Sequence, residues 1–238
     1  MRLRPLHAVS AVCLLVMVGL SAYAWTELPP GEEIPFHWDA SGNVDGYASK
    51  PVALLFVPLL TLGLVVLLSV LPRLDPRRAH IRASAAAYVV IGSAIVILML
   101  VVHAAIVFTA LGAQTDPTLA IAVGIGLLFV VIGSQLGRTQ SNWFLGVRTP
   151  WTLESERSWQ RTHTLAGRLF IVLGIGTVLL ALVAPQLSIW WLVAGVVLLV
   201  AVTFSYSYVV WRDDPDRVPH RDVVDEPRPG HEKATGGR

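Results

Sequence analysis

Six apolar stretches divide the chain, and their pattern predicts six long helices. They run over residues 8–24, 52–71, 85–111, 119–136, 169–184 and 187–210, and none has Asp, Glu, Lys or Arg in its centre. A bilayer core of about 30 Å is crossed by ~20 apolar residues of helix, so most of the six have spanning length. The fifth reaches that length only if its helix begins near Thr164.

The stretches are apolar on all sides, as in VVIGSAIVILMLVVHAAIVF. A helix on the surface of a soluble domain has one apolar stripe and one polar face, so this pattern excludes a soluble helical protein. A transmembrane barrel needs strands of about ten alternating residues, and none is present. The fold class that we expect is an all-α integral membrane protein with six transmembrane helices, an ordered extracellular loop and an interfacial cytoplasmic helix.

Composition and charge support this interpretation and add an orientation. Hydrophobic residues make up 54% of the 238 residues and charged residues only 14%, against about 25% in soluble domains. Of the 18 Lys and Arg residues, all except Lys50 fall on one side of the predicted membrane. This bias places both termini in the cytoplasm. An alternative is that the first stretch, which ends in AYA, is a cleaved secretory signal; the loop that follows would still lie outside.

The stretches and their connections divide the chain into three parts. A two-span module is expected at residues 1–82 with an extracellular loop at 25–51. A four-span module is expected at residues 83–211 with a cytoplasmic loop at 137–164. The tail, residues 212–238, is rich in charge, Pro and Gly and poor in large apolar residues, so we expect disorder there.

Few polar groups lie within the predicted spans. His103 is the one ionisable residue in mid-span, and it either bonds a neighbouring helix or serves function. Cys13 is predicted to be a packing residue. The small-residue sequences VGIG at 123–126 and LGIG at 173–176 suggest a close contact between spans four and five.

The extracellular loop has the composition of an ordered element. IPFHW is β-prone, and SGN and DG are turn signals, so a small hairpin or compact loop is expected. His37, Asp39 and Asp45, with Glu32 and Glu33, also raise a divalent metal site as an alternative. Their spacing matches no established zinc or calcium loop, so a packed loop without metal or cofactor is preferred.

The cytoplasmic loop contains NWFLGVRTPWTLESERSW, which starts at Asn142. Asn142 and Gly146 suit a turn, and Pro150 ends any helix that continues from span four. Thr152 is predicted to cap a new helix that has Glu154 and Glu156 in its first turn. Trp159, His163 and Gly167 would share one face of this amphipathic helix along the membrane surface, with Trp151 and Trp159 as anchors.

Both loops resemble known signatures. IPFHWDASGNVDGYASK is similar to the IPxHWxxxGxxDGYxxK pattern of a bacterial membrane domain of unknown function. NWFLGVRTPWTLESERSWQRTH resembles the SdpI family of multi-span bacterial immunity proteins, and the two modules commonly occur together in this order. The extracellular motif residues are Pro35, His37, Trp38, Asp39, Gly42, Asp45, Gly46, Tyr47 and Lys50. The cytoplasmic motif residues are Asn142, Gly146, Arg148, Thr149, Pro150, Trp151, Thr152, Trp159 and His163.

The resemblance implies a non-enzymatic protein of the bacterial plasma membrane. It implies protection against a secreted antibacterial toxin peptide outside and sequestration of a small cytoplasmic transcriptional repressor inside, with no direct contact to nucleic acid. The extracellular motif would serve recognition, and the cytoplasmic motif would serve a partner or only the fold. A transporter or permease for a small hydrophobic or peptide substrate is the alternative. An enzyme is disfavoured because no nucleophile motif is present.

Overall fold

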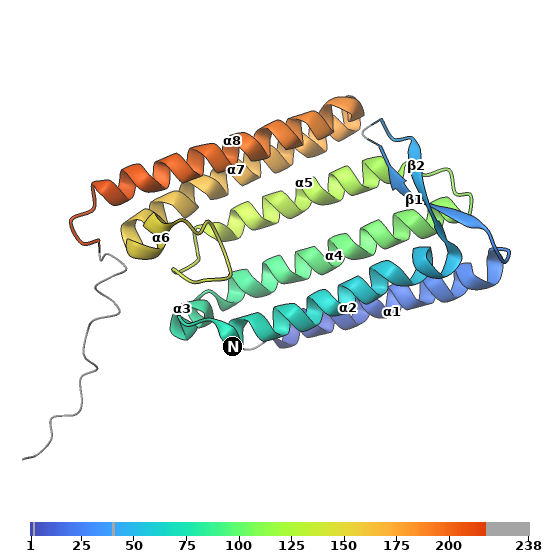
Figure 1. Cartoon of the computed structure of the whole chain (residues 1–238), viewed down its shortest axis with the longest axis horizontal. Helices are drawn as coiled ribbons and strands as arrows, with labels where there is room; N and C mark the ends of the chain where they lie inside the picture. The colour runs from blue at the N-terminus through green and yellow to red at the C-terminus, as the bar shows by residue number, and fades with distance from the viewer. Residues whose placement is uncertain (2, 40, 218–238) are drawn as a thin grey trace, which may run out of the picture.

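Six long helices form the molecule in the computed structural model, which describes residues 1, 3–39 and 41–217 (Figure 1). All six are long and apolar enough to cross a membrane. They are α1 (Arg4–Glu27), α2 (Lys50–Leu74), α4 (Ala85–Ala110), α5 (Pro117–Leu136), α7 (Glu156–Val183) and α8 (Pro185–Arg212). The six predicted spans are therefore confirmed. Two short helices, α3 (Arg78–Ala83) and α6 (Pro150–Glu154), lie in the connections, and the predicted disorder of the tail falls outside the described residues beyond Arg217.

The helices form two groups that meet at α4 and α5 (Figure 1). One group is α1 and α2 packed on α4, and in the other α7 packs on α5 and α8 packs on α7. Because the number of spans is even, α1 begins and α8 ends at the same end of the bundle. We call this end the inner end and the opposite one the outer end, following the charge bias of the sequence.

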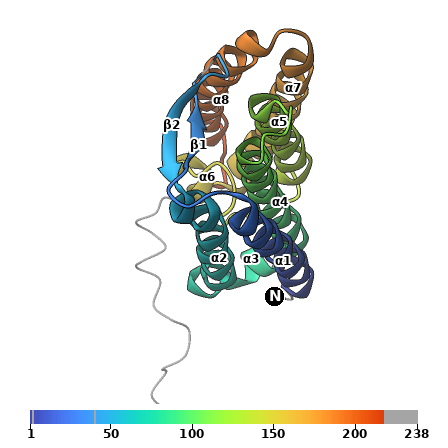
Figure 2. The same ribbon diagram turned by 90° about the vertical axis from the view of Figure 1, so that its right-hand side faces the viewer.

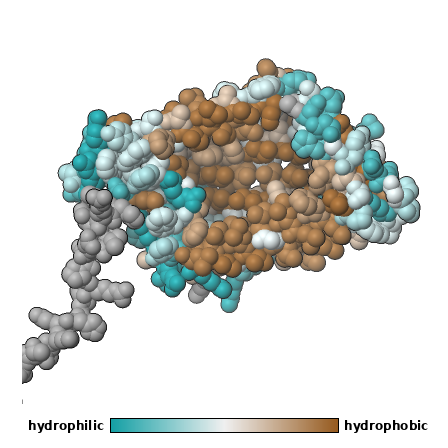
Figure 3. All heavy atoms as spheres, viewed as in Figure 1, coloured by the Kyte–Doolittle hydropathy of each residue, from teal (hydrophilic) through white to brown (hydrophobic). Residues whose placement is uncertain are grey.

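A broad apolar belt covers the middle of the bundle on the face seen in Figure 3, and hydrophilic residues gather at its two ends. Large apolar side chains such as Leu15, Leu59 and Val197 are more than half exposed on this belt. Exposed apolar surface of this extent is not found on soluble monomers. The belt is the surface that lipid covers in a multi-pass membrane protein.

Glycines bring α5 and α7 unusually close together. A Cβ atom added to Gly126 would lie 2.8 Å from the carbonyl oxygen of Gly174, and one added to Gly174 would lie 2.4 Å from that of Gly126. Gly133 and Gly167 form a second contact of the same kind. The contact predicted from VGIG and LGIG is therefore confirmed, because only glycine lets the two backbones approach this closely.

His103 ties α4 to the N-terminal pair of helices. Its fully buried ring donates from Nε2 to the Ser21 hydroxyl at 3.0 Å and to the Met17 carbonyl at 3.2 Å. Ser21 in turn donates to the Leu54 carbonyl on α2 at 2.7 Å. The side chain thus links three helices, which supports the structural interpretation of this residue.

Candidate functional site

The outer loop folds as a two-stranded antiparallel hairpin. Strand β1 (Glu33–Trp38) pairs with β2 (Val44–Ser49), and Pro35 lies opposite Tyr47 in the register. Irregular pairing near His37 lets it face Gly46, where a Cβ would lie 3.0 Å from the Cβ of His37. The predicted hairpin is confirmed.

The turn of the hairpin is organised by Asp39. Its Oδ1 accepts from the backbone N–H groups of Ser41 at 2.7 Å and Asn43 at 2.9 Å, and its Oδ2 accepts from the Asn43 side chain at 3.2 Å. Gly42 takes the positive φ of +85° that this turn requires. The backbone and side-chain hydrogen bonds from Asn43 hold the pKa of the Asp39 carboxyl below its usual value.

We expect this turn to persist in mild acid and to open in strong acid. A lowered folded-state pKa contributes stability above the unfolded value, about 3.9, and this contribution is lost as the pH falls through the lowered pKa. Asp39→Ala should speed hydrogen exchange of the Ser41 and Asn43 amides roughly fivefold at neutral pH. The control is Asp45→Ala, which leaves the turn contacts intact. Exchange in Asp39→Ala that equals the wild type would show that the carboxylate does not hold the turn.

Two exposed side chains of the motif pair on the outer surface of the hairpin. Nδ1 of His37 lies 2.5 Å from Oδ1 of Asp45. Asp39 does not join them, because its carboxylate is used in the turn. Among the described residues no group of three His, Cys, Asp or Glu side chains is placed to hold a metal ion. The pair forms an exposed polar surface on the hairpin.

The base of the hairpin is fixed to the helices by buried contacts. Lys50 is buried, and its ammonium group donates to the Leu28 carbonyl at 2.5 Å and lies 5.2 Å from the centre of the Trp25 ring. Phe36 packs edge-on against Phe56 of α2 at 5.8 Å. Lys50 therefore holds the hairpin in place, whereas Tyr47 remains 60% exposed.

Beneath the hairpin lies an apolar cavity of about 390 Å³, which we call the outer cavity. The hairpin crosses from the α1–α2 side of the bundle toward α8 (Figure 2). Its residues Phe36, His37, Trp38 and Asp39 line the outer end of the cavity. Its walls come from β1, α4, α5, α7 and α8 and include Trp38, Ile106, Ala122, Thr177 and Ile189. The outer motif thus forms the roof of a cavity whose walls are residues of the membrane spans.

The inner loop is built around the Asn142 side chain, which is fully buried. Its Oδ1 accepts from the backbone N–H groups of Phe144 at 2.9 Å and Leu145 at 2.7 Å. Its Nδ2 donates to the carbonyls of Gln140 at 2.8 Å and Leu145 at 3.2 Å. The predicted turn at Asn142 and Gly146 is confirmed, with Gly146 at a φ of +116°.

The His163 side chain supports this turn through a hydrogen bond. Its Nδ1 donates to the Trp159 carbonyl at 2.8 Å, so its Nε2 accepts from the Val147 N–H at 2.9 Å. The Trp159 ring stacks on the imidazole with centres 3.9 Å apart and donates from Nε1 to the Thr139 carbonyl at 2.9 Å. Both side chains are fully buried. The structure therefore joins three motif residues, Gly146, Trp159 and His163, in one packed unit.

The helix start predicted for this loop differs from the one observed. Thr149, not Thr152, caps α6, and the Thr152 hydroxyl accepts from the Thr149 N–H at 3.0 Å as its partner in a capping box. Ser155 caps α7, which has Glu156 in its first turn and runs without a break into span five. The helix predicted to lead into span five is therefore the first part of α7, which begins at Glu156 and not near Thr164.

The two predicted membrane anchors have different positions. Trp159 is buried between α7 and the inner loop, so it is not an anchor in the lipid surface. Trp151 is partly exposed and packs against Phe204 at 4.8 Å and Tyr208 at 5.1 Å, both on α8. Trp151 thus fixes α6 to α8. Arg148 and Pro150 are exposed, and Arg148 donates to the Trp143 carbonyl.

Sequence analysis missed the segment between α2 and α4 that holds the inner loop. Asp75 is fully buried and accepts from the Trp143 N–H at 3.1 Å. Arg77 donates to the Ser141 hydroxyl and to the Leu153 carbonyl, and His80 donates to the Ser141 carbonyl at 2.8 Å. The sequence carries one signal for this segment, which is an Asp followed by Pro and two arginines at the end of the second span. This segment joins the two halves of the chain at the inner end.

Comparison with known proteins supports both motif assignments. Residues 138–209 match the SdpI/YfhL protein family, and residues 12–62 match a domain of unknown function, DUF1648. The chain is 25% identical over 198 residues to "Immunity protein SdpI" of Bacillus subtilis (strain 168). The aligned region covers 83% of this chain and 90% of that protein. No solved structure matches the chain.

Proposed function

Residues 138–209 place this six-helix membrane protein in the SdpI/YfhL family, and from that premise we propose that it protects the cell against a secreted antibacterial toxin peptide. Similarity to an immunity protein over 83% of the chain supports an immunity role. The outer cavity carries the more specific proposal. It lies at the outer end, it is apolar, and its roof is the outer motif.

The chemistry of the outer cavity suits a hydrophobic peptide. Trp38 and Ile189 supply apolar surface, while the exposed His37 and Asp45 supply hydrogen-bonding groups on the hairpin. Ligand sites commonly combine such an apolar surface with a few placed polar groups. We place the toxin peptide against the hairpin with an apolar side chain or segment in the cavity.

The membrane interior favours immunity over transport. The hydroxyl groups of Thr177 and Thr203 donate to the carbonyls of Leu173 and Leu199, one turn back in their own helices, at 2.8 Å. Ser134 does the same with Val131 at 2.7 Å. These hydroxyls are therefore satisfied within their helices and do not form the polar path that a transported peptide would need. The side chains of the sites described above are hydrogen-bonded and packed in a way that suits binding, so we propose a protein that acts without catalysis.

The second part of the proposal is a cytoplasmic partner that binds at the inner end. We place a small cytoplasmic transcriptional repressor against the exposed part of the inner loop, which includes Trp143, Arg148 and Pro150. The buried motif residues Asn142 and His163 are used in the loop itself, so they are not available to a partner. A repressor fused to a fluorescent protein would move to the membrane when the chain is present and would stay in the cytoplasm when it is absent.

Filling the outer cavity should weaken protection. Ala122→Phe adds a ring to the cavity wall, and we expect the toxin concentration that cells survive to fall about tenfold, equivalent to ~1.4 kcal/mol of binding. The measurement is survival of a deletion strain that re-expresses each variant, exposed to secreted peptides from kin strains. The control is Ala201→Phe, on the exposed face of α8.

Two results would contradict the proposal. Full protection by Ala122→Phe at wild-type membrane levels would show that the outer cavity is not the toxin site. Failure of the wild-type chain to protect against any of the peptides, with normal insertion, would contradict the immunity function. Uptake of a peptide by vesicles that contain the protein would favour a transporter instead.

A further inference from the structure

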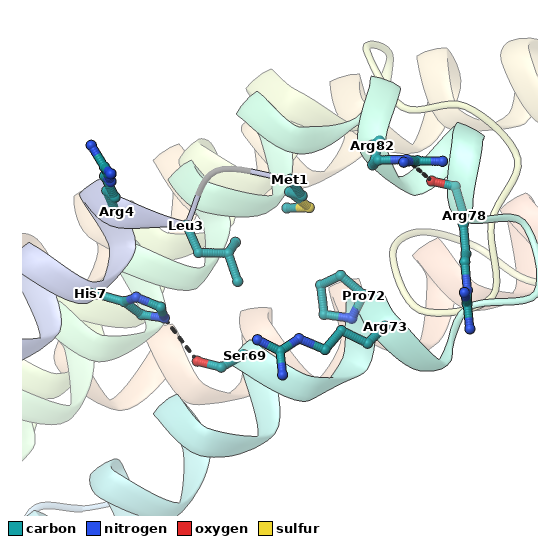
Figure 4. Close-up of a pocket in the computed structure, with 9 residues that line it drawn as sticks. All are labelled: Met1, Leu3, Arg4, His7, Ser69, Pro72, Arg73, Arg78 and Arg82. Atoms are coloured by element: carbon teal, nitrogen blue, oxygen red, sulfur yellow. Dashed lines mark hydrogen bonds between the residues drawn. The ribbon is translucent and has the colours of Figure 1, made fainter.

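A basic pocket of about 620 Å³ opens at the inner end, between the start of α1, the end of α2 and α3 (Figure 4). We call it the N-terminal pocket. Arg73 points back along α2 toward Ser69 and His7, and Arg78 and Arg82 stand across the opening on α3 (Figure 4). Its polar lining is Arg4, His7, Ser69, Arg73, Arg78 and Arg82. It is separate from the outer cavity and from both loop motifs.

No acidic residue in the described part of the chain lies opposite the positive charges that line the N-terminal pocket. Four arginines and one histidine line it, and no acidic residue does. Arg82 donates from Nε to the Arg78 carbonyl, but the guanidinium groups of Arg4, Arg73 and Arg78 have no hydrogen-bond partner among the described residues. Like charges gathered at one pocket repel each other, so an anion that enters it lowers the electrostatic free energy.

Three other arginines at the inner end differ because their side chains bond the fold. Arg77 bonds Ser141 and the Leu153 carbonyl, Arg148 bonds the Trp143 carbonyl, and Arg157 bonds the Asp213 carbonyl at 3.3 Å. A general excess of positive charge on the cytoplasmic side explains why arginines occur here. It does not explain why four arginines line one opening while the guanidinium groups of three of them bond no described residue.

The pocket has a fixed floor. His7 donates from Nε2 to the Ser69 hydroxyl at 3.0 Å, which joins α1 to α2, and Ser69 donates to the Val65 carbonyl at 2.7 Å. At the neighbouring residue of α2, the Tyr88 hydroxyl donates to the Leu68 carbonyl at 2.8 Å, which joins α4 to α2. The two helices that carry Arg4 and Arg73 are therefore held together before any ligand arrives.

The surroundings of the pocket indicate a lipid. Val66, Val70 and Leu74 of α2 are exposed on the apolar belt beside it. A molecule with a phosphate and two acyl chains would place the phosphate among the arginines and lay its chains along α2. We propose that the N-terminal pocket binds the phosphodiester headgroup of an anionic phospholipid, a class of ligand that basic pockets between membrane helices accept. This inference is independent of the toxin proposal.

Thermal unfolding of the detergent-purified full-length chain tests the proposal. A ligand that binds only the folded state raises Tm. We expect dilauroyl phosphatidylglycerol to raise Tm and dilauroyl phosphatidylcholine, which has the same chains without net charge, to leave it unchanged. In Arg73→Gln/Arg78→Gln the half-saturating lipid concentration should rise roughly thirtyfold, because two arginine contacts are lost.

The matched control is Arg138→Gln/Arg161→Gln, which removes the same charge from exposed arginines at the same end. This variant should keep the wild-type response. Three results would overturn the proposal: an equal loss in the control, an equal Tm rise with phosphatidylcholine, or no rise in the wild type. A rise with sodium phosphate that matches the one with phosphatidylglycerol would identify a free-anion site instead of a lipid site.

Discussion

Gly146→Ala is expected to detach the inner loop from α7 and to lower the free energy of unfolding by about 3 kcal/mol or more. The new Cβ would lie 2.1 Å from Nε2 of His163, well inside van der Waals contact. His163 cannot move aside, because it is fully buried, bonded to the Trp159 carbonyl and stacked on the Trp159 ring. The residue would also have to keep a φ of +116°, which L side chains rarely adopt.

A second glycine separates the effect of the clash with His163 from the effect of the positive φ. Gly112 also has a positive φ, +75°, but a Cβ added there would meet nothing within 4 Å. Gly112→Ala should therefore lower the free energy of unfolding only by the cost of backbone strain, about 1 kcal/mol. The measurement is the thermal unfolding of both variants in the same detergent. A loss in Gly146→Ala no larger than that in Gly112→Ala would mean that the loop does not rest on His163.

Gly174→Ala is expected to force α5 and α7 apart at mid-membrane and to destabilise the bundle by about 1–3 kcal/mol. Its Cβ would lie 2.4 Å from the Gly126 carbonyl oxygen and 2.9 Å from the Val130 nitrogen, and both are backbone atoms that no rotamer change can move away. Because α7 also carries α8 and the base of the inner loop, the disturbance should reach both.

The control for this variant is Gly63→Ala on α2. Its Cβ would have nothing within 4 Å, although Gly63 also lies inside an apolar span. Thermal unfolding should place Gly63→Ala near or above the wild type, since alanine has the higher helix propensity. Equal Tm values for the two variants would show that the helices are less closely packed than the structure indicates.

Features that depend on neighbouring residues were predicted from sequence. The six spans follow from the length of each apolar stretch, and the hairpin turn follows from the turn signal SGN, whose Gly42 takes the positive φ. The contact between α5 and α7 was also predicted, since glycine repeats of this kind have few other uses in membrane helices.

Features that depend on distant partners were not predicted. A tryptophan near the start of a span is typical of the membrane surface, so Trp159 was interpreted as an anchor. It is buried because the Thr139 carbonyl and the inner loop cover it from the preceding connection. Arg77 contacts Ser141 and Leu153, more than 60 residues along the chain, and no local pattern reveals such pairs. The N-terminal pocket likewise forms only when α1, α2 and α3 meet.

Most side chains that hold the inner loop bond to main-chain atoms. Asn142 bonds only backbone groups, His163 bonds a backbone N–H and a backbone carbonyl, and Arg77 reaches a carbonyl with one of its donors. A contact with the main chain is insensitive to the side chain of the residue that provides it. The loop can therefore keep its shape while the residues around it vary, and chains that share this motif share a scaffold without having to share a ligand.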